Sequence, residues 1–468
     1  MPSDLTRVLS TAERACVEAP AGFGKTEELV RAVARTAAGR QLILTHTHAG
    51  VHALRKRLKR HGVLEHVFEI DTIAGWCLDL ATSYRGMTGL NIDPPDAYQW
   101  GRIYDAALKV LSQPFMRKVI QSTYTGIYVD EYQDCTISQH KVLLLLAELL
   151  PCRVLGDPLQ GIFDFGGDPL VDWARDVEPA FSLHLRLDTP WRWITANRML
   201  GEWLVTVREA LLQNKPIVFD GAPLTWRNRT PENQVRACYG VVSPKGGSVV
   251  AIHRLRQQCY GIGKRLGGTF SCMEEMECSD LLESAGKLDE KLGPERAAAT
   301  IDFAAKCMTK VLSELKSLRN QFLDGSIPSL AKYKKNAHIV RALIDVAANN
   351  SNLFVSSALK EIGALPGAVL YRKELWFEML RTLSYCEQDK GVSLRETALL
   401  LRQLARQTGR RVEHWTVSTP LLIKGLEFAH SIVLDADQLT SRTLYVALTR
   451  ASQSLTVLSE SRVVVPQR

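Results

Sequence analysis

The sequence predicts an α/β fold with two parallel-sheet domains, the second of which carries an all-helical insertion. Three observations support this prediction. Strand and helix patterns alternate through the first 190 residues, the alternation recurs over about 189–268 and 412–468, and the stretch between them, 269–411, has only helical periodicity. Alternating strands and helices are typical of parallel sheets. The chain has 468 residues, of which 46% are hydrophobic, so it can form several cores.

The first domain is expected to span residues 1–188. Short β-type runs between helical patterns predict buried strands at Ala15–Glu18, Leu42–Thr45, Gly126–Val129, Arg153–Leu155 and Leu183–Leu187. Amphipathic patterns predict helices at Glu27–Thr36 and Ser138–Leu150. Two further helices within Pro94–Val119 would form a small insertion at about 90–122.

The second domain is expected in two parts, 189–268 and 412–468. Its strands are predicted near Ser248–His253, Val412–Ser418, Ser431–Leu434 and Leu455–Leu458. The polar segment Thr225–Gln234 is expected to be a loop.

The insertion, 269–411, is expected to be helical throughout. Apolar residues recur at intervals of three and four from Ile301 to Phe322, which predicts one long amphipathic helix. Similar patterns predict helices at Ser329–Ala348, Tyr371–Tyr385 and Leu394–Gln407.

Composition limits the class of protein. A net charge of +8 and a pI of about 8.9 are compatible with a nucleic-acid partner. The ten cysteines include no Cys-x-x-Cys pair, which argues against a disulfide framework or a metal cluster and favours a reducing, cytoplasmic compartment. No run of about 18 apolar residues is present, so no membrane partner is expected.

Ala19–Thr26 has the composition of a phosphate-binding loop that opens a helix. Gly22 and Gly24, on either side of Phe23, allow backbone amides to approach phosphates without a Cβ in the way. Lys25 would reach the β- and γ-phosphates, and the Thr26 hydroxyl would ligate Mg²⁺. The alternative is a chance glycine-rich turn.

Two carboxylates follow the predicted strand Gly126–Val129 directly. Asp130 would hold Mg²⁺ and Glu131 would position the attacking water. Because the phosphate loop and these carboxylates both follow parallel strands, they should meet at one sheet edge. Two solvated carboxylates are the alternative, but the apolar strand before them and the phosphate loop favour an ATP- and Mg²⁺-dependent hydrolase.

Five segments resemble, in order, motifs of the superfamily 1A helicases of the UvrD/PcrA/Rep group. Asp130–Asp134 resembles that family's DExQD box, and the others are Leu155–Phe163 (GDxxQxIY), Leu187–Arg192 (LxxNYR), Ile423–Phe428 (KGLEF) and Leu444–Ala451. The resemblance implies two RecA-like P-loop NTPase domains, with ATP between them and arginines of the second domain facing the phosphate loop of the first.

The same resemblance implies roles at the nucleotide for residues of both domains. Gln160 would sense the γ-phosphate and Arg192 would contact it, while Arg450 would act as an arginine finger. Trp191 would stack on the base, and Glu427, two residues after Gly425, would reach the ribose. The family's adenine-reading Gln has no counterpart in residues 1–18, which leaves base preference open.

Other resemblances concern nucleic acid. Leu44–Gly50 resembles the family's TFTNKA segment and Asp71–Trp76 its TFHSF segment, which implies contacts from His46, Thr47 and Thr72. Phe163 and Phe165 stand where the family has aromatic residues that stack on bases, and core packing is the alternative for both. Some residues that contact nucleic acid in the family are missing here, since Gly166 stands where an Arg is usual and Leu421 where a His is usual.

The sequence therefore predicts an ATP-dependent translocase or helicase that moves 3′ to 5′ on single-stranded DNA or at junctions of single and double strands. The alternative is a DNA- or nucleotide-sensing regulatory ATPase that controls a partner nuclease and unwinds little, like the compact UvrD-like subunits of phage-defence systems such as Gabija. A scaffold without turnover is disfavoured, because Lys25, Glu131 and Arg450 are all present.

Overall fold

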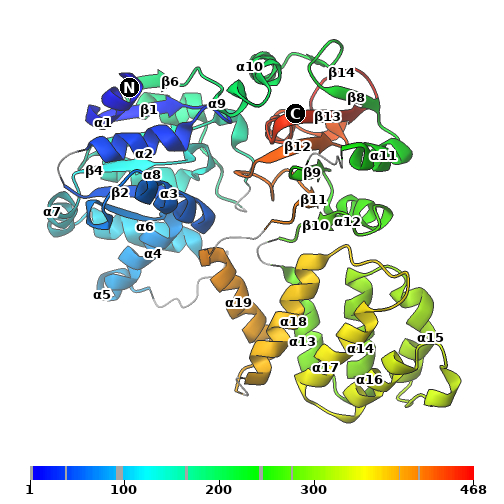
Figure 1. The fold of residues 1–468 in the computed structure, drawn as a ribbon. Coiled ribbons are helices and arrows are strands. Elements are labelled where there is room, and N and C mark those ends of the chain that lie inside the picture. Colours follow the sequence, from blue (N-terminus) through cyan, green and yellow to red (C-terminus); the bar gives the residue numbers. More distant parts are fainter. Residues whose placement is uncertain are drawn as a thin grey trace.

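The fold is that of a computed structural model, which describes residues 4–36, 39–90, 99–163, 167–241, 246–275, 278–388, 391–408 and 412–467 (Figure 1). It contains two six-stranded sheets and a separate cluster of helices. All strand pairs within the two large sheets are parallel. The predicted α/β class is confirmed, and the two sheets are consistent with two RecA-like domains.

The first sheet has the strand order β3-β2-β4-β5-β1-β6. Its strands are β1 (Arg14–Glu18), β2 (Gln41–Thr45), β3 (Phe68–Thr72), β4 (Gly126–Val129), β5 (Cys152–Gly156) and β6 (Leu183–Arg186). The sequence prediction missed β3, which alternates buried and half-buried residues at the sheet edge instead of forming an apolar run.

Helices cover both faces of this sheet (Figure 1). They are α1 (Asp4–Thr11), α2 (Lys25–Arg35), α3 (His48–Arg60), α4 (Ile73–Ser83), α5 (Arg85–Thr88), α6 (Trp100–Leu111), α7 (Pro114–Thr123) and α8 (Ile137–Ala147). Single turns lie at η1 (Glu65–Val67), η2 (Tyr132–Asp134), η3 (Pro158–Gln160), η4 (Trp173–Val177) and η5 (Glu178–Ala180). Helices α6 and α7 lie where two helices were expected, and α6 packs on α4 and α8.

The second sheet has the order β10-β11-β9-β12-β13-β8. Its strands are β8 (Thr225–Asn228), β9 (Val249–Ile252), β10 (Ser271–Cys272), β11 (Trp415–Ser418), β12 (Phe428–Val433) and β13 (Ala451–Ser459), and β7 (Ile217–Val218) pairs separately with β14 (Val463–Val464). The accompanying helices are α9 (Trp191–Ile194), α10 (Arg198–Leu212), α11 (Pro231–Val241), α12 (Arg256–Arg265), η7 (Ala436–Gln438) and α20 (Ser441–Leu448).

The loop expected at Thr225–Gln234 is wrong. Its first part is the edge strand β8 and its last part opens α11. The sequence did not predict this strand because β8 is an edge strand whose residues are exposed or half-buried, and such a strand needs no apolar run. Pro231 begins α11, a position where its fixed φ favours a helix.

The helical cluster comprises α13 (Ser279–Glu290), α14 (Gly293–Cys307), α15 (Val311–Leu323), η6 (Leu330–Lys332), α16 (Ala337–Ala348), α17 (Asn352–Gly363), α18 (Lys373–Gln388) and α19 (Leu394–Thr408). It has a hydrophobic core of its own. The cluster lies between β10 and β11, within the stretch 269–411 where a helical insertion was expected, although the domain boundaries themselves stay a prediction. The expectation that this stretch is helical throughout is wrong at its start, because Ser271–Cys272 form β10, a short edge strand of the second sheet. Helix α19 also packs on α3 of the first domain (Figure 1).

The single long helix expected from Ile301 to Phe322 is wrong. The chain breaks between Cys307 and Val311, where Lys310 adopts a left-handed conformation with φ of 62°. Helices α14 and α15 then pack against each other. The apolar spacing runs on in phase across the break, so periodicity alone could not reveal it.

Within the described ranges, none of the helices has the length and apolar character needed to cross a lipid bilayer.

Replacing Phe322 by Ala should destabilise the helical cluster by about 3–5 kcal/mol, because the side chain is fully buried in its core. Phe377→Ala is the matched control, since that ring is 58% exposed and its loss should cost no more than about 0.5 kcal/mol. Urea unfolding followed by circular dichroism measures both. ATP affinity of folded Phe322→Ala should equal that of the wild type, and a loss would mean that the cluster belongs to the nucleotide site.

Candidate nucleotide and nucleic-acid site

The phosphate loop runs from the end of β1 into α2. Gly22 and Gly24 have left-handed backbones, with φ of 78° and 85°. A Cβ on Gly22 would lie 2.7 Å from the Trp193 ring, and one on Gly24 would lie 3.0 Å from the Trp191 ring. Both positions therefore need glycine for conformation and for space. Helix α2 begins at Lys25, so its N-terminus faces the loop and favours an anion there.

Phe23 differs from the other loop residues. Its side chain is 6% exposed and packs into a hydrophobic cluster that contains residues of both domains, and its amide donates to the carbonyl of Pro20. The nucleotide contact expected of Phe23 therefore stays a prediction, while its side chain has a structural role.

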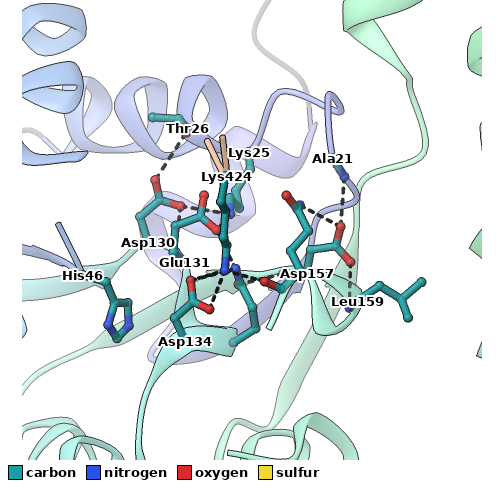
Figure 2. Close-up of polar contacts among 12 residues, drawn as sticks. Ala21, Lys25, Thr26, His46, Asp130, Glu131, Asp134, Asp157, Leu159 and Lys424 are labelled. Atoms are coloured by element: carbon teal, nitrogen blue, oxygen red, sulfur yellow. Dashed lines mark hydrogen bonds and ion pairs between the residues drawn. The ribbon is translucent and has the colours of Figure 1, made fainter. Parts of the chain in front are cut away.

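Lys25 and the two carboxylates meet at one edge of the sheet, as the sequence predicted (Figure 2). The Lys25 Nζ lies 2.7 Å from Glu131 Oε2 and 3.6 Å from Asp130 Oδ1. Glu131 has a φ of 59°, a conformation that non-glycine residues rarely adopt and that is common at functional sites. Gln133 donates to Glu131 Oε2 over 2.6 Å and so fixes this carboxylate from the other side.

The charges of this cluster are set by burial and by one another. Burial acts to raise the pKa of Glu131, but the Lys25 and Lys424 ammonium groups outweigh it and lower that pKa to about 2. Burial also opposes the charge of Lys25, yet the Glu131 and Asp130 carboxylates raise its pKa above the usual value. Burial raises the pKa of Asp130. Glu131 is therefore ionised near neutral pH.

Thr26 and Asp130 have the chemistry of a magnesium site. The Thr26 hydroxyl donates to Asp130 Oδ2 over 3.3 Å, so two hard oxygen donors lie together beside the phosphate loop. Mg²⁺ prefers oxygen ligands and is commonly held by one or two protein groups together with phosphate oxygens and water. In the part of the chain that the structure describes, no group of three or more His, Cys, Asp or Glu side chains could hold a metal. The residues present thus fit an ion that arrives with a nucleotide.

Gln160 and Arg450 form a contact between the two domains. Arg450 Nη2 donates to Gln160 Oε1 over 3.1 Å, and Gln160 Nε2 donates to Asp157 Oδ2 over 2.9 Å. Arg450 is 2% exposed and also donates to the carbonyls of Val446 and Leu426. Burial and the charge of Arg192 lower the pKa of Arg450 to about 9. The expected arginine finger is thus held by a hydrogen-bonded network behind the phosphate loop.

Arg192 and Glu427, both expected at the nucleotide, pair with each other. Arg192 Nε donates to Glu427 Oε2 over 2.9 Å, and its Nη1 donates to the Thr449 carbonyl over 2.6 Å. Gly425 lies in the same loop as Glu427 and has a φ of 78°. Trp191 is 58% exposed beside Gly24, which suits a stacking platform. The nucleotide roles of these residues stay predictions.

Sequence reasoning missed the residues that hold the phosphate loop from behind. The Ala21 amide donates to Asp157 Oδ2 over 3.0 Å and to the Tyr445 hydroxyl over 3.2 Å. Arg208 is buried and pairs with Asp157 over 3.2 Å and with Glu18 over 2.6 Å. Asp157 and Tyr445 lie inside the recognised motifs, so their positions were a signal, whereas nothing marked Arg208 on its helix.

The residues expected to contact nucleic acid lie at or after the ends of strands of the first sheet, but several of their side chains already have other partners. Thr47 accepts from the Gly50 amide and Thr72 from the Gly75 amide, so each caps a helix. His46 Nε2 lies 3.4 Å from Cys135 Sγ, and burial together with Lys424 lowers its pKa to about 3, so it is neutral. Phe163 is half-buried beneath the Lys424 ammonium. Phe165 lies outside the described residues. The nucleic-acid contacts of all five stay predictions.

Lys424, from the loop between β11 and β12, reaches Asp134 of the first domain (Figure 2). Its Nζ lies 2.5 Å from both carboxylate oxygens of Asp134. Burial raises the pKa of Asp134 to about 7 and lowers that of Lys424. The sequence prediction assigned no role to either side chain, although both lie within recognised motifs.

Comparisons with known proteins agree with this site. Residues 95–169 match the family model of the UvrD/REP helicase N-terminal domain. Over 86 residues the chain is 30% identical to the RecBCD enzyme subunit RecB of Buchnera aphidicola subsp. Acyrthosiphon pisum (strain APS), a match that covers 18% of this chain and 7% of that protein. The chain thus spans a small part of the length of the curated relative that it matches.

Among solved structures, the Pif1 helicase from Candida albicans aligns with a TM-score of 0.32 and 12% identity, over 58% of this chain and 55% of that chain.

Replacing Glu131 by Gln should leave ATP affinity within about threefold of the wild type and lower turnover by at least about 10²-fold, because only proton acceptance from water is lost. Glu148→Gln is the matched control, as that carboxylate is exposed at the end of α8. Phosphate release and equilibrium nucleotide binding test both variants. Wild-type turnover in Glu131→Gln would show that another group is the base.

Proposed function

We propose that this chain, a UvrD-like superfamily 1 helicase by its family match and motif order, uses ATP hydrolysis to move along single-stranded DNA. The observation that carries the proposal is the cross-cleft network around the phosphate loop, in which Tyr445 and Arg450 of the second domain reach Ala21 and Gln160 of the first. Through such a network, the presence or absence of the γ-phosphate can determine the relative orientation of the two domains.

In the proposed hydrolysis, each residue of the phosphate site has a separate role. Phosphates lie on the loop at the start of α2, and Lys25 leaves Glu131 for the phosphate oxygens. Glu131 then accepts a proton from water as the water oxygen bonds to the γ-phosphorus. The bond from that phosphorus to the bridging oxygen breaks, which gives ADP and inorganic phosphate. Magnesium on Thr26 and Asp130, when bound, supplies positive charge to the phosphate oxygens.

Arg192 and Arg450 would neutralise the charge that spreads over the γ-phosphate in the transition state. Both belong to the second domain, so they can do so only while the cleft is closed. Loss of the γ-phosphate removes that attraction and favours opening. Alternate closing and opening on DNA would move the chain along the strand, and we propose the 3′ to 5′ direction.

A second function is favoured by one observation. Thr47 and Thr72 are engaged as helix caps and His46 is neutral, which weakens the expected nucleic-acid surface. A regulatory ATPase, which senses DNA and acts on a partner nuclease with little unwinding, needs only this weaker engagement.

The two functions differ in two assays on the purified chain. ATP hydrolysis is measured with and without single-stranded oligo(dT), and strand separation is measured on duplexes with a 3′ or a 5′ tail. A motor should show DNA-stimulated hydrolysis and should separate the 3′-tailed duplex. Stimulated hydrolysis with neither duplex separated would indicate the regulatory ATPase, and absence of hydrolysis under all conditions would contradict both.

Replacing Trp191 by Ala should weaken the binding of ATP and GTP alike, by about tenfold, because stacking is worth about 1–3 kcal/mol and tolerates any base. In the wild type, ATP and GTP should be hydrolysed within about tenfold of each other, which corresponds to about one hydrogen bond. Tyr239→Ala is the control, since that ring is 48% exposed on α11. Competition binding showing that only ATP loses affinity in Trp191→Ala would mean that the indole is part of an adenine-specific site.

A further inference from the structure

The loop between β11 and β12 places a buried ammonium group between the two proposed ligand sites. Lys424 Nζ lies 2.5 Å from both Asp134 oxygens and also donates to the Gln160 carbonyl. The same atom lies 4.6 Å from the centre of the Phe163 ring. Its side chain is 6% exposed and that of Asp134 1%. This residue of the second domain therefore contacts the first domain at three points.

On one side, the Lys424 contacts lead to the nucleotide. Asp134 ends the turn η2, which Glu131 directly precedes, and Gln133 in that turn donates to Glu131 Oε2 and accepts from the Asp157 amide. The Gln160 carbonyl belongs to the residue whose side chain accepts from Arg450. A shift of the Lys424 ammonium would therefore displace both the carboxylate and the amide that face the γ-phosphate.

On the other side, the contacts lead to the proposed nucleic-acid track. A cation over an aromatic face is attracted to it, and the attraction grows when water is excluded. Phe163 is one of the rings on which we expect a base to stack. A base that moves this ring therefore also moves the Lys424 ammonium or costs its cation–π contact.

The residues that follow Lys424 connect a displacement of its ammonium group to the arginines of the second domain. Gly425 turns the chain with a φ of 78°, the Leu426 carbonyl accepts from Arg450, and Glu427 pairs with Arg192. Two contacts, made two and three residues after Lys424, thus connect its loop with both arginines that we place at the γ-phosphate.

We propose that Lys424 is a positioning residue that couples the occupancy of the nucleic-acid track to the geometry of the nucleotide site. This inference rests on the proposed function for the identity of the two ligands. It differs from that function in predicting a mutual effect of the two ligands on binding, which exists whether or not ATP is hydrolysed.

The test measures the affinity for fluorescent oligo(dT) with and without a non-hydrolysable ATP analogue and magnesium. In the wild type, the analogue should change the DNA affinity by about fivefold or more. The double variant Lys424→Met/Asp134→Asn removes both charges, so no unpaired charge is left buried. It should melt like the wild type and bind each ligand alone within about twofold of wild-type affinity, but the effect of one ligand on the other should vanish.

Two further variants separate coupling from simple loss of a domain contact. Arg442→Met removes another bond across the cleft, from Arg442 Nη1 to the Gly161 carbonyl over 3.1 Å, and should keep the wild-type coupling. Lys424→Arg keeps the positive charge and should restore part of it.

The inference would be overturned if the double variant kept the wild-type coupling, or if the analogue did not change the DNA affinity of the wild type. It would also be overturned if the double variant bound both ligands more weakly and had a lower melting temperature than the wild type. ATP hydrolysis is measured on the same samples. A wild type that couples the two ligands but hydrolyses no ATP would contradict the proposed function and leave this inference supported.

Discussion

The geometry of the nucleotide site depends on one buried carboxylate, Asp157. It is fully buried, accepts from the Ala21 amide and from Gln160, and pairs with Arg208. A charged group in the interior is tolerated only when its partners satisfy it, so the loss of any one of them is costly. Asp157 therefore ties the phosphate loop, Gln160 and helix α10 into one unit. The Tyr445 hydroxyl, which also reaches Ala21, brings the second domain into the same unit.

Arg192 and Arg450 of the second domain are held in place by other residues of the chain. Arg192 is paired with Glu427, and Arg450 is satisfied by carbonyls and by Gln160. Both guanidinium groups are therefore already ordered, and the conformational entropy of ordering them is not lost again on binding. A ligand would compete with existing partners instead of capturing mobile side chains. This arrangement favours a response to nucleotide that depends on the whole cleft and not on a single residue.

The sequence alone predicted the α/β class, the nine strands with apolar runs and the meeting of Lys25, Asp130 and Glu131 at one edge. The family model that matches residues 95–169 agrees with the resemblance drawn from the motifs at Asp130–Asp134 and Leu155–Phe163. The predictions failed where the local pattern is ambiguous. Edge strands such as β8 need no apolar run, and the reversal at Lys310 preserves the apolar spacing of a continuous helix. The contacts of Arg208 and Lys424 depend on residues far away in the chain, which no local pattern can indicate.

The position of the helical cluster in the second sheet defines how much of the sheet depends on the cluster. The chain enters the cluster after β10 and leaves it before β11, and these two strands are parallel neighbours. Parallel neighbours must be joined by a crossover that returns the chain to the opposite end of the sheet, and a dozen or more residues are enough for that purpose. The whole cluster is therefore an enlarged crossover connection. A single helix at this point would suffice to connect β10 with β11, so no strand pairing of the second sheet requires the rest of the cluster.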